Sequence, residues 1–372
     1  MRILALTDFS GYAVGGTPTA AIGLIRGLLD AGHEVGLHID RLYPGIDGCV
    51  HLSGDFSAAL DAFAPDLVHV LAVGFRTVPS LAKVLRGKPW VLTVHSVSPH
   101  EKKFSLFHGH EQIHYAMRDL KWLPQTLLTR SILRSTDIPR VIVHSDGLRE
   151  RLRPYVGDGI TTIDLAVNEA PGGSESTSES RIEAPRIATV AGFLHTKGLT
   201  DGVIAVSKLR ATWPGLKYRL IGEVRDRSYL AFLQRFVEKR GLGDCVELVI
   251  GLTEEQKWEA LRSSDLYLQP SHEEGFCLAF LEGAMMVPRV VGADTGAIRR
   301  ICADETGMAC VPTKRPLQLA AEMRRLLEQP LDRGAVLGAR RARLSQRYSI
   351  ARYVHEHVAL YQSLIDGGRY RD

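Results

Sequence analysis

The sequence has few cysteines and no long apolar run, and both absences narrow its class. Cysteine occurs five times in 372 residues, an odd count without metal-site spacing, so we expect reduced thiols rather than a disulfide framework. The N-terminal apolar stretch is too short for a signal peptide, and no segment approaches the roughly 18 apolar residues of a membrane span. A net charge of +4 gives no argument for nucleic acid as a partner. These features predict a folded cytoplasmic protein.

Length and patterning predict two domains. A chain of 372 residues exceeds what one hydrophobic core usually supports. Strand-length apolar runs alternate with helical segments through residues 1–167 and again through 186–345, a rhythm typical of parallel sheets wound by helices. Residues 168–185 are rich in Gly, Ser, Glu and Pro and are predicted to be a linker. The fold class is therefore α/β, with two Rossmann-like domains facing across a cleft, and residues 346–372 are predicted to form a C-terminal helix that packs back on the first domain.

The strongest local signal is a pair of glutamates, Glu274 and Glu282, eight positions apart across the start of a predicted helix. The free backbone N–H groups and the dipole at that helix start are expected to hold an anion such as a diphosphate. Glu282 would accept hydrogen bonds from ribose hydroxyls, and Glu274 would face a sugar. Such a spacing also occurs on solvated helix faces, so the order of strand, turn and helix carries the argument. The residues between the strand end and the helix are Gly275, Phe276, Cys277 and Leu278.

This block resembles the E-x7-E signature of the family 4 retaining glycosyltransferases, which have the GT-B fold, and the resemblance covers nearly the whole chain. In that family a glycine-rich strand end with an Arg and a Lys opens the second domain, and residues 190–198 resemble it. The resemblance implies that Gly192, Phe193 and Lys197 contact the donor, with Lys197 neutralising the leaving diphosphate. Phe193 stands about where the family has its Arg, so Arg225 or Arg227 is the expected substitute.

Two further segments resemble the same family. Asp294–Ala297 is similar to the glycine loop near the sugar, and Gly307–Pro312 is similar to a later conserved stretch. In the first domain, the resemblance implies that Gly15, Gly16 and Thr17 form an N-terminal glycine loop on the acceptor side, although a tight turn with a helix cap explains them equally. His95, at the end of the strand over 90–94, resembles an active-site histidine.

A competing motif lies in the first half. His110, Glu111 and His114 fit the zinc-protease pattern H-E-x-x-H. A third ligand is missing, because the position of the metzincin histidine is Leu120 and no glutamate occurs between 114 and 150. The surrounding segment, His100–Arg134, instead reads as a basic and aromatic insertion. It is expected either to contact an anionic membrane surface or anionic acceptor, or to be a solvated helix pair.

The sequence and the resemblance together predict a hexosyltransferase-type enzyme. It would move a sugar, with retention, from a nucleotide-diphosphate sugar to a glycan, lipid-linked or small-molecule acceptor in glycan, glycolipid or glycoconjugate biosynthesis. No D-x-D-type pair is present in the donor region, so no metal and no cofactor beyond the nucleotide sugar is expected. The protein would work in the cytoplasm, with peripheral association at the inner face of the membrane as an open possibility. A nucleotide-sugar epimerase of the same fold and a non-catalytic sugar-binding module remain as alternatives.

Overall fold

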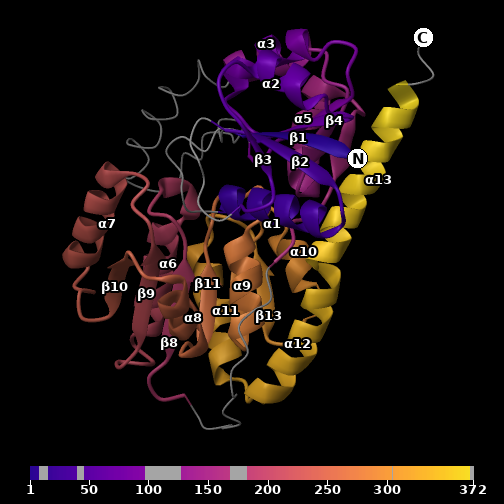
Figure 1. Ribbon diagram of the computed structural model, residues 1–372. Helices are drawn as coiled ribbons and strands as arrows, with labels where there is room; N and C mark the ends of the chain where they lie inside the picture. Colours follow the sequence, from indigo (N-terminus) through magenta and orange to yellow (C-terminus); the bar gives the residue numbers. More distant parts are fainter. Residues whose placement is uncertain (8–15, 40–45, 97–126, 168–181, 304, 369–372) are drawn as a thin grey trace. The chain divides into compact units, whose positions relative to one another are not determined.

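The computed structural model describes residues 1–7, 16–39, 46–96, 127–167, 182–303 and 305–368. The chain divides into two compact units (Figure 1). The first unit comprises Met1–Ala166 together with Ile350–Asp372, and the second comprises Val167–Ser349. Residues 168–181 of the predicted linker lie outside the described residues.

The first unit is built on a seven-stranded, wholly parallel sheet in the order β3-β2-β1-β4-β5-β6-β7. Its central strands are buried along almost their whole length, as expected of parallel strands with helices on both faces. The order 3-2-1-4-5 is that of a doubly wound sheet, and it confirms the α/β class for this half. The strands are β1 (Arg2–Thr7), β2 (Glu34–His38), β3 (Val50–Leu52), β4 (Leu67–Ala72), β5 (Trp90–Thr93), β6 (Val141–Val143) and β7 (Ile160–Thr162).

Helices on one face of this sheet share a single apolar core. Leu60 on the second helix, Leu81 on the third and Leu148 on the fifth are all buried in it. Helix α5 begins at a serine cap, since the Ser145 hydroxyl accepts from the backbone of Leu148. The helices of this unit are α1 (Gly16–Asp30), α2 (Phe56–Phe63), η1 (Phe75–Thr77), α3 (Val78–Val84), a stretch at 127–135, α5 (Asp146–Val156) and α13 (Ile350–Gly368).

The C-terminal helix α13 packs against α1 of the first unit. The two helices approach closely at Gly27, where a Cβ atom would lie 2.4 Å from a side-chain carbon of Val354. Glycine is therefore required for this contact. Arg352 adds a polar anchor, because its guanidinium donates to the backbone carbonyl of Asp164 at 2.6 Å. The last helix thus completes the fold of the N-terminal half.

Buried histidines join α13 to the sheet of the first unit. The ring of His69, on β4, hydrogen-bonds to the Tyr361 hydroxyl at 2.6 Å and to Thr93 at 2.7 Å. The ring of His357, on α13, stacks on His69 with 5.7 Å between centroids and donates through Nδ1 to the Tyr353 carbonyl. Burial lowers the pKa of His357 from 6.5 to about 4, against the opposing effect of that hydrogen bond. At neutral pH the His357 ring, through which α13 contacts the sheet, is therefore uncharged.

Acid should consequently destabilise the first unit well above the pH at which carboxylates titrate. In the unfolded chain His357 binds a proton near pH 6.5, and in the folded protein only near pH 4. The unfolded state therefore binds more protons between these two pH values, and the free energy of unfolding decreases as the pH is lowered. Between pH 7 and pH 5 the loss from this one residue should be about 2 kcal/mol. Urea unfolding of the wild type and of His357→Gln at both pH values measures it. An equal pH dependence in the two proteins would contradict the assignment.

The second unit is built on a six-stranded parallel sheet in the order β10-β9-β8-β11-β12-β13. With the first sheet it establishes the predicted architecture of two doubly wound α/β halves. The strands are β8 (Arg186–Val190), β9 (Lys217–Gly222), β10 (Val246–Ile250), β11 (Leu266–Gln269), β12 (Arg289–Ala293) and β13 (Met308–Val311).

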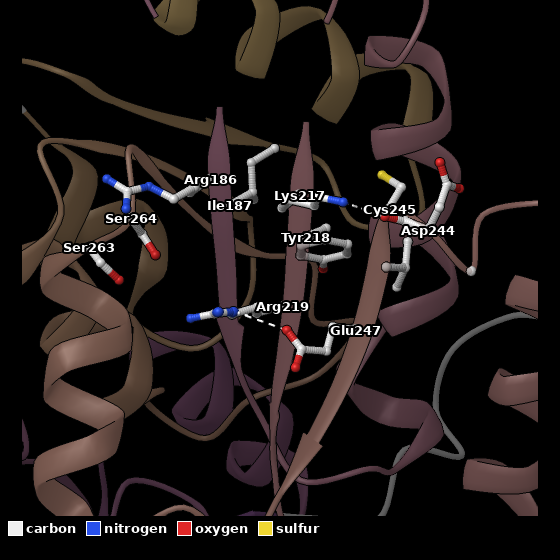
Figure 2. A pocket seen from close by; sticks show the side chains of 12 residues that line it. Arg186, Ile187, Lys217, Tyr218, Arg219, Asp244, Cys245, Glu247, Ser263 and Ser264 are labelled. Carbon is white, nitrogen blue, oxygen red and sulfur yellow. Dashed lines mark hydrogen bonds and ion pairs between the residues drawn. The ribbon is translucent and has the colours of Figure 1, made fainter. Parts of the chain in front are cut away.

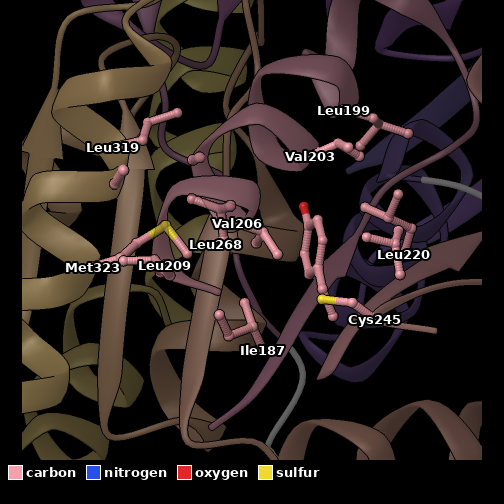
Figure 3. Packing of buried hydrophobic residues seen from close by; sticks show 14 of the residues in the cluster. Ile187, Leu199, Val203, Val206, Leu209, Leu220, Cys245, Leu268, Leu319 and Met323 are labelled. Atoms are coloured by element: carbon pink, nitrogen blue, oxygen red, sulfur yellow. The ribbon is translucent and has the colours of Figure 1, made fainter. Parts of the chain in front are cut away.

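A large apolar core fills one face of this sheet, where α6 (Leu199–Leu209) and α11 (Pro316–Glu328) cover the strands (Figure 3). Val203 from α6 and Met323 from α11 are fully buried on it. Tyr218 stands at its centre, with its hydroxyl 2.9 Å from that of Thr189. A Cβ atom at Gly202 would lie 2.5 Å from the Tyr218 hydroxyl, so a glycine on α6 makes room for the ring.

Helix α9 (Leu278–Met286) packs on β8, β11 and β12, and α8 (Glu254–Arg262) packs on α9. Helix α12 is fastened to this layer by Arg340, whose fully buried guanidinium donates to the carbonyls of Ala284 at 3.0 Å and Val287 at 2.9 Å. The helices of the second unit are η2 (His195–Lys197), α6 (Leu199–Leu209), α7 (Arg227–Lys239), α8 (Glu254–Arg262), α9 (Leu278–Met286), α10 (Ile298–Cys302), α11 (Pro316–Glu328) and α12 (Arg333–Arg347).

Candidate active site

The segments that follow β8 and β11 meet at the carboxyl edge of the second sheet. The two strands are neighbours and run parallel, so both chains leave the sheet on the same side. The backbone N–H groups of His272 and Glu273 donate to the Thr196 carbonyl at 2.8 and 3.2 Å. Gly198 has φ +59°, and a Cβ atom there would lie 2.1 Å from the Pro270 carbonyl oxygen. Only glycine allows this approach, which fixes the loop that carries Lys197.

Lys197 and Glu274 form an ion pair at this edge. The lysine Nζ lies 2.9 and 2.8 Å from the two carboxylate oxygens. Burial would lower the pKa of Lys197, but the neighbouring Glu274 carboxylate outweighs it, and the net effect is a raised pKa. The lysine therefore stays charged at neutral pH. The sequence predicted both residues at the site, and the structure brings them into direct contact.

A chain of polar side chains extends from Glu274 into the sheet. Ser271 donates to a Glu274 carboxylate oxygen at 2.7 Å, and Gln269 donates to the Ser271 hydroxyl at 2.8 Å. Tyr267 donates in turn to the Gln269 side-chain oxygen at 2.6 Å. The sequence analysis did not predict these residues, although Tyr267 and Gln269, two positions apart on β11, lie on one side of the strand and Ser271 follows just beyond its end. Because every link is buried, the network holds the carboxylate in one orientation.

The start of α9 presents backbone donors next to this carboxylate. Cys277 precedes the helix with φ 90°, and the Phe280 N–H turns back to its carbonyl at 3.1 Å. Within the described ranges, the N–H groups of residues 275–278 donate to no acceptor. The side chains of Phe276, Cys277 and Leu278 are buried, so this segment offers its backbone rather than its side chains. Free N–H groups and the helix dipole suit an anion.

The loop Asp294–Ala297 closes over the other side of Glu274. The Glu274 N–H donates to the Thr295 hydroxyl at 3.1 Å, and the Ala297 N–H donates to the Phe276 carbonyl at 2.9 Å. Gly296 has φ +61°, and a Cβ atom there would lie 2.7 Å from the Phe276 carbonyl oxygen. The segment that resembles the family's glycine loop is therefore in direct contact with the backbone of Glu274, the predicted sugar-binding residue.

Glu282 is held by a lysine that was not predicted. Its carboxylate accepts from Nζ of Lys257 at 3.0 Å, and the same Nζ lies 2.7 Å from Glu254. Burial raises the pKa of Glu282, and the Lys257 ammonium opposes that shift. Lys257 lies on α8, 25 positions away in sequence, so only the packing of α8 on α9 reveals the pair.

Phe193, which stands at the position of the family's arginine, and its two predicted substitutes, Arg225 and Arg227, differ in their placement. Phe193 is fully buried in the core of the second unit, and its N–H donates to the Glu223 carbonyl at 2.8 Å. Its side chain does not line the site, contrary to the prediction, because an apolar ring gains most by packing in the core. Arg225 lies across Gly192, where a Cβ atom would be 2.8 Å from the arginine Cγ. Arg227 begins α7 and is exposed.

The predicted acceptor-side residues belong to the first unit. His95 follows β5, and its Nε2–H donates to the Leu71 carbonyl at 3.0 Å. Burial lowers the pKa of His95 to about 4, so the ring is neutral at pH 7 and its Nδ1 is an acceptor. Gly16 and Thr17 are the first residues of α1, whereas Gly15 lies outside the described residues.

The zinc motif cannot be placed in the same way. His110, Glu111 and His114, and most of the insertion over 100–134, lie outside the described residues, so the structure does not test the alternative of a zinc protease. In the described ranges, no three His, Cys, Asp or Glu side chains are grouped as a metal would require.

A pocket of about 440 Å³ opens at the opposite edge of the second sheet, at the amino ends of β8, β9 and β10 (Figure 2). The charged side chains that line this pocket already form ion pairs or hydrogen bonds. Arg219 pairs with Glu247 at 3.1 Å, and Lys217 donates to the Asp244 carbonyl at 2.7 Å. Ligands of open parallel sheets bind at the carboxyl ends of the strands, so the Lys197–Glu274 edge remains the candidate site.

The chain is similar to known proteins both in sequence and in fold. Residues 176–347 match the family model described as glycosyl transferases group 1. The glycogen synthase of Mycobacterium tuberculosis is 24% identical over 94% of this chain and 91% of its own. A sucrose-phosphate synthase structure from Thermosynechococcus elongatus has a TM-score of 0.75 at 18% identity, covering 98% of this chain and 99% of that one. The HepE protein of Anabaena, in complex with UDP and glucose, has a TM-score of 0.72 at 16% identity, covering 98% and 100%.

Proposed function

We propose that this chain is a glycosyltransferase that transfers a sugar from a nucleoside-diphosphate sugar to an acceptor hydroxyl with retention of configuration; the family-model match over residues 176–347 and the GT-B fold support the proposal. The observation that carries the proposal is the Lys197–Glu274 pair beside the free N–H groups that begin α9. A diphosphate requires a cation and N–H donors, and sugar hydroxyls require a carboxylate. The resemblance to family 4 supplies the retention, and the UDP bound by the Anabaena protein supports a nucleotide donor.

Donor binding would rearrange the ion pair. The diphosphate would take up the hydrogen bonds of Lys197 and the N–H groups of residues 275–278. Glu274, held by Ser271 and Thr295, would then be free to accept from sugar hydroxyls. As the bond from the anomeric carbon to the phosphate oxygen breaks, its electron pair passes to that oxygen, where Lys197 and the helix N-terminus stabilise the charge. The acceptor oxygen forms the new bond on the same face and its proton passes to the leaving phosphate.

Three other predicted residues would have roles in this scheme. Glu282, fixed by Lys257, would accept from the ribose hydroxyls, one turn beyond the diphosphate. The neutral ring of His95 in the first unit would accept a hydrogen bond from a sugar hydroxyl through Nδ1. Arg225 would supply a second cation beside Gly192. The family model favours the transferase over the epimerase alternative.

A panel of nucleotide sugars tests the function directly. The true donor should raise the melting temperature, since a ligand at 100 times its Kd stabilises the folded state by about 2.7 kcal/mol. The same compound with an acceptor panel should yield a glycoside of unchanged anomeric configuration, measured by NMR. An inverted product would contradict retention. Epimerised donor without any glycoside would support the epimerase.

Turnover is expected to persist in excess EDTA, because a lysine and backbone amides take the place of a metal in the proposed mechanism. Steady-state rates before and after chelation, with Mg²⁺, Mn²⁺ and Zn²⁺ added back separately, provide the measurement. Loss of activity that a divalent ion restores would overturn the metal-free mechanism. Restoration by Zn²⁺ alone would return attention to His110 and His114.

The first unit also has a surface suited to an anionic membrane. Between residues 67 and 136 its described parts contain no Asp or Glu and include six Lys or Arg, of which all but Arg130 are exposed. Leu127, Leu128 and Val84 expose 53, 39 and 39% of their surface on the same segments. In the described part of the chain, no helix has the length and apolar character of a membrane span. On the basis of these cations and exposed apolar side chains we propose peripheral binding at the inner face of the membrane. The cationic residues are Arg76, Lys83, Arg86, Lys88, Arg130 and Arg134.

Sedimentation with liposomes tests this surface. The protein should pellet with vesicles containing phosphatidylglycerol at low salt and be released at high salt, because the attraction is screened. The double variant Lys83→Glu/Arg86→Glu should stay in the supernatant. The matched control Lys239→Glu, on exposed α7 of the second unit, should pellet normally. Equal recovery with neutral and anionic vesicles would exclude an electrostatic membrane contact.

A further inference from the structure

His272 contacts the chain on both sides of Lys197. It lies two residues before Glu274, in the segment that follows β11, and its backbone N–H donates to the Thr196 carbonyl at 2.8 Å. On the other side of the lysine, a Cβ atom at Gly198 would lie 2.9 Å from Cδ2 and 3.0 Å from Nε2 of the His272 ring. One residue of the segment that carries Glu274 therefore holds the backbone before Lys197 and packs against the backbone after it.

Asp201 holds the His272 ring in this place. Nε2 of the ring lies 2.8 Å from a carboxylate oxygen of Asp201, and because a carboxylate only accepts, Nε2 carries the proton and donates. Asp201 lies in the first turn of α6, and its own N–H donates to the Gly198 carbonyl at 2.9 Å. The side chains of His272 and Asp201 expose only 16 and 15% of their surface, so little water competes for the hydrogen bond between them.

A role in the helix alone does not account for this arrangement. A carboxylate in the first turn favours the helix through its dipole whether or not a histidine faces it. His272 lies 71 positions from Asp201 in sequence and belongs to the other segment of the candidate site. The pair therefore ties the start of α6, which follows Lys197, to the segment that carries Glu274.

We propose that His272 and Asp201 form a positioning pair that sets the placement of the Lys197 ammonium against the Glu274 carboxylate. The lysine Nζ lies 2.9 and 2.8 Å from the two carboxylate oxygens, and these contacts require the two segments to keep their relative position. Loss of the pair removes a buried side-chain link between the segments and lets the ammonium move. A displacement of about 1 Å can cost up to 10²-fold in rate, so the pair supports turnover without contacting the donor. The effect on turnover rests on the proposed function, whereas the placement of Lys197 does not.

Competitive acetylation of the folded, full-length protein tests the placement of Lys197 without any donor. Acetic anhydride should label Lys197 slowly in the wild type, because its ammonium is paired and only 26% of its side chain is exposed. Lys208, an exposed lysine on α6, is the internal reference in the peptide map. Asp201→Ala and His272→Ala should each raise the labelling of Lys197 relative to Lys208 by about fivefold, since local opening exposes the amine. His272→Gln, whose side-chain amide can still donate to Asp201, should stay near the wild type.

Melting temperatures measured in parallel show whether these variants are folded. Unchanged relative labelling in the folded alanine variants would overturn the proposal. If an alanine variant does not fold, Asp201→Asn, which removes the charge at unchanged size, gives the same comparison, and unchanged labelling of Lys197 there would equally overturn it.

Turnover gives a second readout that a general loss of stability would not reproduce. In Asp201→Ala, kcat should fall about tenfold while KM for the donor changes by no more than about twofold, because a displaced ammonium still attracts the diphosphate but no longer meets the leaving oxygen. In a Lys197→Ala background the same substitution should have no further effect, since both changes act through one group. The matched control Asp244→Ala breaks the ion pair with Arg210 in the same unit and should leave kcat unchanged.

The kinetic outcomes separate the positioning role from the proposed function. An equal further loss of kcat in the Lys197→Ala background would show that Asp201 does not act through the lysine, and would overturn the positioning role. If no donor supports transfer at all, the proposed function fails, while the labelling of Lys197 still decides whether the pair places the ammonium.

Discussion

Lys197→Ala is expected to lower kcat/KM by about 10²- to 10³-fold, the usual effect of removing one preorganised donor from a developing oxyanion. In the structure this ammonium is held 2.8 Å from Glu274, already charged and already at the edge where the diphosphate would bind. The transition state places more negative charge on the leaving oxygen than the ground state does. The loss should therefore fall on kcat as well as on donor affinity.

Controls separate this effect from misfolding. The substitution leaves the buried Glu274 carboxylate without its cation, so thermal stability must be measured in parallel. Lys197→Arg keeps the charge and should recover part of the rate, whereas Lys208→Ala, an exposed lysine on α6 of the same unit, should behave as the wild type. If folded Lys197→Ala retains most of its activity, the leaving group is neutralised elsewhere, with Arg225 the next residue to replace.

The two-half α/β fold could be predicted because it depends on local patterning. Apolar runs of strand length, alternating with helical segments, leave few arrangements other than parallel sheets covered on both faces. The helix after Glu274 could also be predicted from the sequence, because a strand end, a glycine and an apolar helical run follow one another there. The structure places Lys197 on that same edge because β8 and β11 are adjacent.

What escaped prediction depends on contacts between distant segments. Lys257 meets Glu282 only through the packing of α8 on α9. Phe193 was misassigned because its position in a motif was given more weight than its apolar ring, which the core accommodates. The motif correctly located the backbone of this segment, but the direction of the Phe193 side chain depends on its burial in the core.

Substitution of Glu274 and of Glu282 should have different effects on kcat and on binding of the nucleoside diphosphate. Glu274→Gln removes the carboxylate that would stabilise the sugar as positive charge develops, so kcat should fall by about 10²-fold. Binding of the free nucleoside diphosphate should be unchanged or tighter, because Lys197 no longer has to leave an ion pair with contacts of 2.8 and 2.9 Å. Glu282→Gln should instead weaken the nucleoside diphosphate and the intact donor alike, by about tenfold, with little change in kcat.

Calorimetry with the nucleoside diphosphate alone, beside steady-state kinetics with the intact donor, separates the two glutamates. Glu254→Gln is the matched control, because Glu254 also contacts Lys257 but is largely exposed on α8, and it should change neither quantity. If Glu254→Gln reproduces the Glu282 phenotype, the effect runs through Lys257 and not through the ribose. Weaker diphosphate binding in Glu274→Gln would show that this carboxylate positions Lys197 for the phosphate, and the sugar contact would have to be assigned to another residue.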